Sequence, residues 1–211
     1  MSAVKILGLN ASPIGGGNTE ILISEIMRGA ESAGAECKHV LLNELVIKPC
    51  QSCGKSPEPE LCFLRDDMDP LYQQLREYDG FVLGSPIYFD TVSAQMKLFI
   101  DRCNCLRPQT PKENQGGDFY LKELIHKKRS GAMVLVGGER QEFECARKVI
   151  AGFFAWASIE SVGQIFYVSK SWGKGKVAAE PEILKKAFEL GELLVQKNTA
   201  RGDEPAYSFL R

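Results

Sequence analysis

The chain contains the stretch Val4-Lys5-Ile6-Leu7-Gly8-Leu9, which continues as Asn10-Ala11-Ser12-Pro13-Ile14-Gly15-Gly16-Gly17-Asn18-Thr19. An apolar strand that runs into a glycine-rich loop is typical of the first unit of an open parallel α/β sheet. Residues 20–33 then predict a helix, because apolar side chains recur on one face at Ile21, Leu22, Ile26 and Met27. The chain therefore begins with a strand, a loop and a helix of such a sheet.

Two further loops repeat this arrangement. Gly84-Ser85-Pro86-Ile87-Tyr88-Phe89 follows the strand Phe81-Val82-Leu83, and Gly137-Gly138-Glu139-Arg140-Gln141 follows the strand Ala132-Met133-Val134-Leu135-Val136. Ligands of open parallel sheets bind beyond the carboxyl ends of the strands, where the strand order reverses. The three loops therefore predict one site for a flat, phosphorylated ligand, and their chemistry indicates a flavin.

The other segments continue the alternation of strands and helices. The pattern predicts strands at 37–42 and 162–168, and helices from Asp69-Pro70 onward and at 92–103, 121–125, 142–155 and 181–197. We therefore predict an α/β fold of the flavodoxin-like type, with a five-stranded parallel sheet and helices on both faces. The strand order 2-1-3-4-5 comes from that fold class and not from individual residues.

One domain is expected over residues 1–211. It includes a cysteine-bearing excursion at 46–65, a long loop at 104–119 and a C-terminal tail at 199–211. The Gly/Lys loop at 173–176 is expected to be solvated.

Composition excludes several classes of function. The 211 residues carry a net charge of −1, which predicts no strong attraction to nucleic acid or to a membrane surface. No signal peptide and no apolar run long enough to span a bilayer is expected. The seven cysteines are an odd number and are partly clustered, which suits reduced thiols in the cytoplasm better than a disulfide framework.

The first loop is expected to hold a phosphate group. Unpaired backbone N–H groups and the helix dipole favour an anion at a helix N-terminus, and glycines such as Gly17 permit close approach. Ser12 and Thr19 offer hydroxyl groups, and Asn18 offers an amide donor. No lysine follows the glycines, so the loop is not that of a nucleoside triphosphatase, and it does not match G-x-G-x-x-G. The alternative is a glycine-rich turn capped by Asn18 or Thr19.

The second loop is expected to hold an aromatic ring. Ser85 and Pro86 end the predicted strand, and Ile87, Tyr88 and Phe89 follow outside it. This cluster could edge an isoalloxazine ring while loop amides bind its pyrimidine part. The alternative is that Tyr88 and Phe89 pack on the next helix.

These motifs together resemble a known family. The residues that carry the resemblance are Asn10 to Pro13, Gly17-Asn18-Thr19, Gly84 to Phe89, Val92-Ser93-Ala94-Gln95-Met96-Lys97 and Asp101-Arg102. They are similar to the NAD(P)H-dependent FMN reductase-like flavoproteins of flavodoxin fold, which are related to the iron–sulfur flavoproteins.

The resemblance implies the cofactor and its contacts. It implies FMN, with the phosphate at Ser12, Asn18 and Thr19 and the ring at Pro86 to Phe89. Gly137 and Gly138 match a third flavin-contacting loop, although that loop is usually longer and richer in glycine. NADH or NADPH is the transient co-substrate that the family implies. Lys97, Asp101 and Arg102 are expected to form structural ion pairs and loop anchors.

The cysteine excursion has a separate interpretation. Cys50, Cys53 and Cys62 resemble a cluster-binding insertion of the iron–sulfur branch, but the third position is Ser56. A [4Fe–4S] cluster normally needs four thiolates, so we expect no stable cluster and no metal site. Three interpretations stay open for these thiols: a vestigial site, a redox-active Cys50/Cys53 pair, or ordinary thiols.

The sequence therefore predicts an FMN-dependent oxidoreductase. Electrons are expected to pass from NADH or NADPH through FMN to a small acceptor: a quinone, a flavin, a nitroaromatic compound or a metal ion. The alternative is an electron-transfer flavoprotein of the iron–sulfur type without its own NAD(P)H activity. We also expect a homo-oligomer, either a dimer or a tetramer.

Overall fold

The computed structural model describes residues 3–53, 62–108, 123–125, 128–170 and 173–201. Its main strands are β1 (Lys5–Asn10), β2 (Glu36–Leu41), β3 (Gly80–Tyr88), β7 (Arg129–Gly138) and β8 (Ile159–Ser169). Its α-helices are α1 (Asn18–Ser32), α2 (Met68–Glu77), α3 (Ala94–Arg102), α4 (Glu144–Trp156) and α5 (Pro181–Arg201). Short 3-10 turns are η1 (Leu42–Glu44), η2 (Cys103–Cys105) and η4 (Lys176–Ala179).

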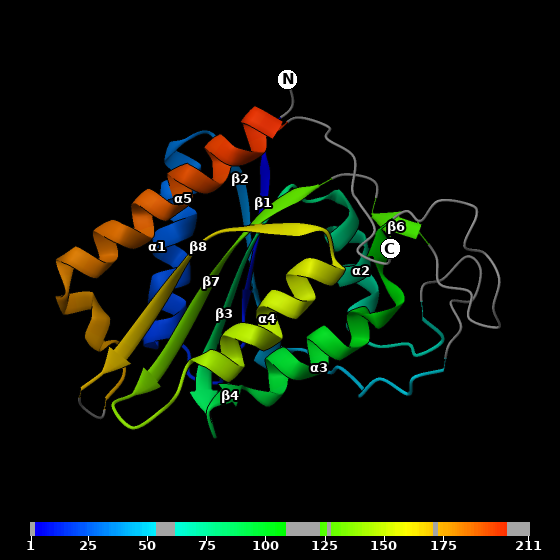
Figure 1. Cartoon of the computed structure of the whole chain (residues 1–211), viewed down its shortest axis with the longest axis horizontal. Helices are drawn as coiled ribbons and strands as arrows, with labels where there is room; N and C mark the ends of the chain where they lie inside the picture. The colour runs from blue at the N-terminus through cyan, green and yellow to red at the C-terminus, as the bar shows by residue number, and fades with distance from the viewer. Residues whose placement is uncertain (1–2, 54–61, 109–122, 126–127, 171–172, 202–211) are drawn as a thin grey trace.

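The sheet has the flavodoxin-like strand order. Its path is β2-β1-β3-β7-β8, and all four pairings along this path are parallel. This is the predicted order 2-1-3-4-5. A sixth strand, β4 (Thr91–Val92), pairs antiparallel with the end of β3 and was not predicted. The five parallel strands end at the same edge of the sheet (Figure 1).

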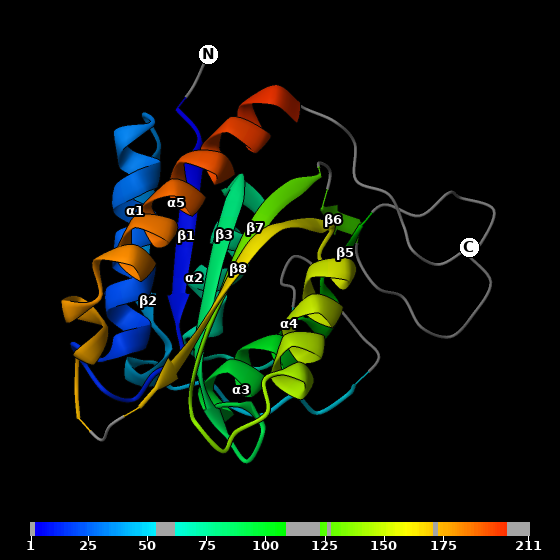
Figure 2. The ribbon, with the colours of Figure 1, turned by 60° about the vertical axis from the view of Figure 1, so that its left-hand side comes forward.

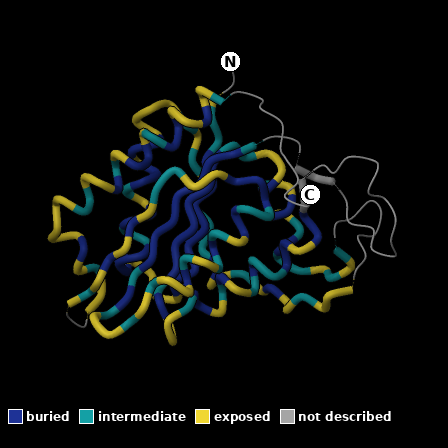
Figure 3. Tube along the Cα trace, viewed as in Figure 1, coloured by how far each residue is buried: buried dark blue, intermediate teal, exposed yellow. Residues whose placement is uncertain are grey.

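Helices cover both faces of the sheet, as predicted. α1 and α5 lie on one face, and α2, α3 and α4 lie on the other (Figure 2). The three central strands β1, β3 and β7 are buried along most of their length (Figure 3), because helices exclude water from both faces. The edge strands β2 and β8 are more exposed. Across the described ranges, we find no helix that is both long and apolar enough to cross a membrane.

Strand β3 is longer than the sequence predicted. It continues through Pro86 to Tyr88, whereas the prediction ended it at Leu83. Proline lacks the N–H group that a sheet ladder normally uses. β1 ends at Asn10, which lies opposite Gly84 of β3. The Gly84 carbonyl points toward β1, because it accepts the N–H of Ala11. The backbone nitrogen of Pro86, two residues later, also points toward the β1 side, but it lies beyond the end of β1. The N–H group that proline lacks therefore removes no hydrogen bond from the sheet.

The region after α3 also differs from prediction. Residues 123–125, expected in a short helix, form β6 (Glu123–Ile125), which pairs in parallel with β5 (Arg107–Pro108). Pairing with a distant segment overrides local helix preference here. The remainder of the predicted long loop, 109–119, lies outside the described residues, as do tail residues 202–211.

Two glycines bring α1 and α5 into backbone contact. A Cβ atom on Gly191 of α5 would overlap the carbonyl oxygen of Ile26, and one on Gly29 of α1 would overlap that of Phe188. Gly152 of α4, by contrast, has nothing within 4 Å of the corresponding position.

We therefore predict opposite effects for two Gly→Ala substitutions. Gly191→Ala should lower the free energy of unfolding by about 1–3 kcal/mol, because the helices must separate. Gly152→Ala should raise it by up to about 1 kcal/mol, because alanine favours an open helical position. Urea unfolding of both variants measures this, and equal effects would contradict the close packing.

Candidate functional site

The carboxyl ends of the parallel strands bring the predicted loops together. The first loop leaves β1, the second ends β3 and the third ends β7, and these strands are adjacent in the sheet. Between β1 and β3 lies the point where the strand order reverses, which is where ligands of such sheets bind. The three loops that the sequence singled out therefore form one edge of the molecule.

Hydrogen bonds join the first loop to the second. The Ala11 N–H donates to the Gly84 carbonyl at 2.8 Å. The Ser93 hydroxyl donates to the Ala11 carbonyl at 2.8 Å, and the Ser93 N–H donates to Ser85 Oγ at 2.9 Å. Ser93 is fully buried and also caps α3 by accepting the N–H of Met96. The sequence analysis gave Ser93 no role, although a serine before a helix is a recognisable cap.

The N-terminus of α1 is open to an anion. Its N-cap residue is Gly17, and no side chain caps the helix. The first N–H groups of a helix have no partner within the helix, so they remain available to a ligand. Gly16, with φ +64°, donates its N–H to a carboxylate oxygen of Glu20 at 2.9 Å. The loop thus already accommodates an anionic oxygen.

The predicted phosphate residues have different surroundings. Thr19 is 2 % exposed, and its hydroxyl has no hydrogen-bond partner among the described residues. Ser12 Oγ accepts the N–H of Ile14 at 3.2 Å. Asn18 Oδ1 accepts the N–H of Val177 at 3.0 Å, which leaves its amide nitrogen as a donor. Asn10 Nδ2, at the end of β1, is buried without a partner in the described part of the chain.

A fourth loop reaches this edge from the end of β8. The Lys174 side chain lies over Gly16, so that a Cβ on Gly16 would come within 2.8 Å of Lys174 Cε and 3.2 Å of its ammonium nitrogen. Lys174 is exposed, as expected of a solvated loop, but the segment also packs on the first loop through Gly175 and Val177. The sequence analysis missed this contact, because it depends on the position of β8 in the sheet.

The predicted ring residues divide into buried and exposed positions. Ser85 is buried, and its hydroxyl donates to the Pro86 carbonyl at 2.8 Å. Ile87 is also buried in the core on the side of α2, α3 and α4. Tyr88 is 42 % exposed and Phe89 is 99 % exposed. Both aromatic residues are therefore exposed at the sheet edge, and the exposure of Phe89 rules out its packing on the next helix.

The third loop is held against the second by one side chain. Gln141 Nε2 donates to the Ile87 carbonyl at 2.8 Å, and Gln141 Oε1 accepts the N–H of Gly138 at 2.6 Å. Gly137 and Gly138 themselves lie at the end of β7. A Cβ on Gly137 would lie 2.9 Å from the Phe143 ring and 3.1 Å from Gln141 Oε1, so this position favours glycine.

The arrangement fits a flavin mononucleotide. The uncapped helix N-terminus and the unpartnered Thr19 hydroxyl suit a phosphate monoester, and the exposed Tyr88 suits the edge of a ring. The Lys174 ammonium adds a positive charge beside the loop, next to the hydroxyl and amide donors that the sequence predicted.

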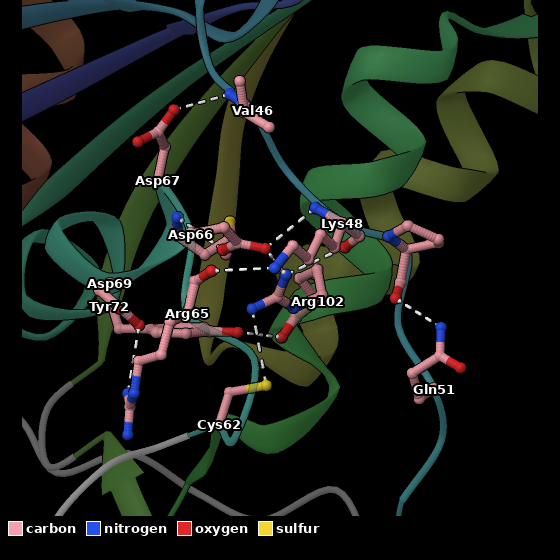
Figure 4. Close-up of polar contacts among 12 residues, drawn as sticks. Val46, Lys48, Gln51, Cys62, Arg65, Asp66, Asp67, Asp69, Tyr72 and Arg102 are labelled. Atoms are coloured by element: carbon pink, nitrogen blue, oxygen red, sulfur yellow. Dashed lines mark hydrogen bonds and ion pairs between the residues drawn. The ribbon is translucent and has the colours of Figure 1, made fainter.

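The cysteine excursion is anchored to α3 by a buried ion pair (Figure 4). Arg102 Nη1 contacts Asp66 and also donates to the Lys48 carbonyl at 3.0 Å, and both side chains of the pair are almost fully buried. Arg102 Nη2 lies 3.5 Å from Cys62 Sγ. Burial alone raises the pKa of Asp66. The hydrogen bonds from Arg102 and from the N–H groups of Lys48 and Met68 outweigh this effect, so the pKa of Asp66 lies below its usual value.

In the cysteine excursion, Cys50 and Cys62 are half-buried and Cys53 is exposed. Within residues 3–53 and the other described ranges, no three His, Cys, Asp or Glu side chains are grouped to hold a metal ion. The Cys62 thiol contacts Arg102, and Ser56 lies outside the described residues.

Comparison with known proteins establishes the family. Residues 4–173 match the family described as NADPH-dependent FMN reductase. The chain belongs to the NADPH-dependent FMN reductase family.

The relatives of this chain include proteins named iron–sulfur flavoproteins. One from Archaeoglobus fulgidus is 31% identical over 198 residues, which cover 93% of this chain and 80% of the relative. One from Methanocaldococcus jannaschii is 36% identical over 104 residues, which cover 49% of this chain and 54% of the relative. A flavodoxin from the domain Archaea superposes with a TM-score of 0.55 at 15% identity, covering 93% of this chain and 99% of the flavodoxin, and shows the shared fold.

We predict that the buried Asp66–Arg102 ion pair contributes far more to the free energy of unfolding than an exposed ion pair does. Asp66→Asn should lower the free energy of unfolding by about 3–5 kcal/mol, because it leaves the Arg102 charge buried and unpaired. Asp101→Asn, which breaks the exposed pair with Lys97, should cost about 0–1 kcal/mol. Urea unfolding at neutral pH measures both.

The pH dependence follows from the lowered pKa of Asp66. A carboxyl with a lowered folded-state pKa stabilises the fold above its unfolded pKa of about 3.9, and this contribution is lost as the pH falls toward the folded value. Wild-type stability should therefore fall more steeply below about pH 4 than that of Asp66→Asn. Parallel curves would contradict the role of the pair.

Proposed function

We propose that this chain is an FMN-dependent oxidoreductase that takes electrons from NADH or NADPH and passes them to a small acceptor. The observation that carries the proposal is the uncapped N-terminus of α1 at the point where the strand order reverses, together with Thr19, a buried residue whose hydroxyl has no hydrogen-bond partner among the described residues. Membership of the FMN reductase family supports the same cofactor.

The chain supplies binding and orientation. The N–H groups at the start of α1, the Thr19 hydroxyl and the Asn18 amide would hold the phosphate of FMN, and Lys174 would partly offset its charge. The second and third loops would position the ring edge, because Gln141 and Ser93 fix those loops to each other and to the first. When bound, FMN supplies two-electron chemistry, so no catalytic acid or base is assigned.

The setting in the cell is part of this proposal. We assign the protein to the cytoplasm, because its odd number of cysteines favours reduced thiols. A homo-oligomer, either a dimer or a tetramer, would cover the open side of the ring, and a small molecule would accept the electrons. The net charge of −1 favours neither nucleic acid nor a membrane as a partner.

A second candidate is an electron-transfer flavoprotein without its own NAD(P)H activity. The names of the iron–sulfur flavoprotein relatives and the cysteine excursion favour it. It requires a cluster as the second redox centre, and Ser56 stands at the third cysteine position of the iron–sulfur branch, which leaves three thiolates in the excursion where a [4Fe–4S] cluster normally needs four. The oxidoreductase that takes electrons from NADH or NADPH therefore has stronger support than the electron-transfer flavoprotein.

We predict fast reduction of the FMN-loaded protein by NADPH or NADH. Mixing without oxygen should bleach the flavin absorbance within seconds, and dithionite provides a positive control. Iron and acid-labile sulfide should each be far below one per chain in protein purified without oxygen. The double variant Cys50→Ser, Cys53→Ser should be reduced at the wild-type rate, because we expect hydride to pass from the nicotinamide to FMN directly.

A different pair of results would favour the carrier. Reduction by dithionite but not by NADPH or NADH, together with roughly four iron and four sulfide per chain, would overturn the reductase assignment. A protein that neither contains FMN nor binds added FMN would overturn both candidates.

A further inference from the structure

The turn between β3 and β4 has an unusual backbone conformation. Ile87 pairs with Val92 and Tyr88 with Thr91, which leaves Phe89 and Asp90 as a two-residue hairpin loop. Their φ angles are +50° and +58°. Two consecutive positive φ angles are those of a type I′ turn, whose usual residues are asparagine, aspartate and glycine. A phenylalanine in this conformation is strained, because its Cβ crowds the backbone.

The Phe89 ring gains no burial in return for this strain. The residue is 99 % exposed, so packing does not explain the choice of a large apolar side chain. Strained residues that persist at a binding edge point to a function of the side chain. Phe89 directly follows β3, in a turn that is hydrogen-bonded to the segment after β7 through Gln141 and Asp90.

Neighbouring groups hold the turn from the side of the third loop. Gln141 binds the Ile87 carbonyl, as described above, and Asp90 Oδ1 accepts the N–H of Glu142 at 2.8 Å. One bond lies at each end of the Tyr88-Phe89 segment. The turn is therefore rigidly presented, which reduces the entropy lost when a ligand contacts the ring.

We propose that Phe89 is a specificity-determining residue that selects flat aromatic electron acceptors by stacking against them at the sheet edge. This inference rests on the proposed function. A small molecule fits better than a protein partner, because one ring beside the charged Asp90 and the part-exposed Tyr88 offers far less area than a stable protein interface needs. Aromatic pairs gain from offset or edge contacts in addition to burial.

Two electron acceptors, a quinone and ferricyanide, distinguish stacking of the acceptor on Phe89 from the supply of electrons by the flavin. Conversion of 1,4-naphthoquinone to its hydroquinone takes two electrons and two protons; both electrons and one proton come from two-electron-reduced FMN, and the second proton comes from solvent. Two ferricyanide ions take one electron each and leave the flavin proton to solvent. Ferricyanide has no aromatic face, so stacking on Phe89 does not assist it.

The variants are Phe89→Asn, which tolerates the positive φ but lacks a ring, and Phe89→Tyr, which keeps the ring. Phe63→Asn is the control, because Phe63 is another exposed phenylalanine, on the cysteine excursion. Calorimetry gives the Kd of 1,4-naphthoquinone for the oxidised, FMN-loaded protein. Stopped-flow reoxidation after dithionite reduction gives the ratio of the naphthoquinone and ferricyanide rate constants without any use of NADPH.

Phe89→Asn should raise the Kd about tenfold and lower the ratio about tenfold. Phe89→Tyr and Phe63→Asn should keep both values within about twofold of wild type. In the apo-protein, Phe89→Gly should raise the thermal midpoint by about 2–4 °C, because glycine relieves the strain.

Several results would overturn the inference. Unchanged Kd and unchanged ratio in Phe89→Asn would remove Phe89 from acceptor selection while leaving the oxidoreductase assignment intact. Loss of oligomers in Phe89→Asn with an unchanged Kd would make Phe89 a contact between copies of the chain. Failure of the wild-type protein to bind FMN would overturn the proposed function and this inference together.

Discussion

The Ser93 hydroxyl joins the parts of the site that come from different strands. It donates to the Ala11 carbonyl in the first loop, while the Ser93 N–H donates to Ser85 in the second loop and the same side chain caps α3. A parallel sheet brings its strand ends to one edge, but it does not fix the loops beyond them. Hydrogen bonds of this kind supply that second constraint, and Gln141 extends it to the third loop.

Away from the site, the buried Arg129 of β7 holds two helices to the sheet. Arg129 donates to the carbonyls of Leu75 and Ala157 at the ends of α2 and α4, and its guanidinium lies over the Phe81 ring. Positive charge at helix C-termini is favourable because it complements the helix dipole. Arg102 has a comparable role in the cysteine excursion, where it pairs with Asp66. The excursion is thus attached to α3, whose first turn borders the site.

Much of the fold and the position of the site could be predicted from the sequence. Apolar strands followed by glycine loops predicted the α/β class and the convergence of three loops, because these depend on local patterns and on general rules of parallel sheets. The strand order followed from the fold class and not from individual residues. The pairing of residues 123–125 and the contact of Lys174 with Gly16 could not be predicted, since both depend on distant segments. The positive φ of Phe89 was also missed, because phenylalanine is not among the usual residues of such a turn.

The central claim is that the N-terminus of α1 binds the phosphate of a flavin. Fluorescence titration of the apo-protein with FMN and with riboflavin, which lacks the phosphate, tests it most directly. We expect FMN to bind at least about tenfold more tightly, because hydrogen bonds to a charged group contribute roughly 1.5–3 kcal/mol each. Equal affinities for the two flavins, or binding of neither, would contradict it.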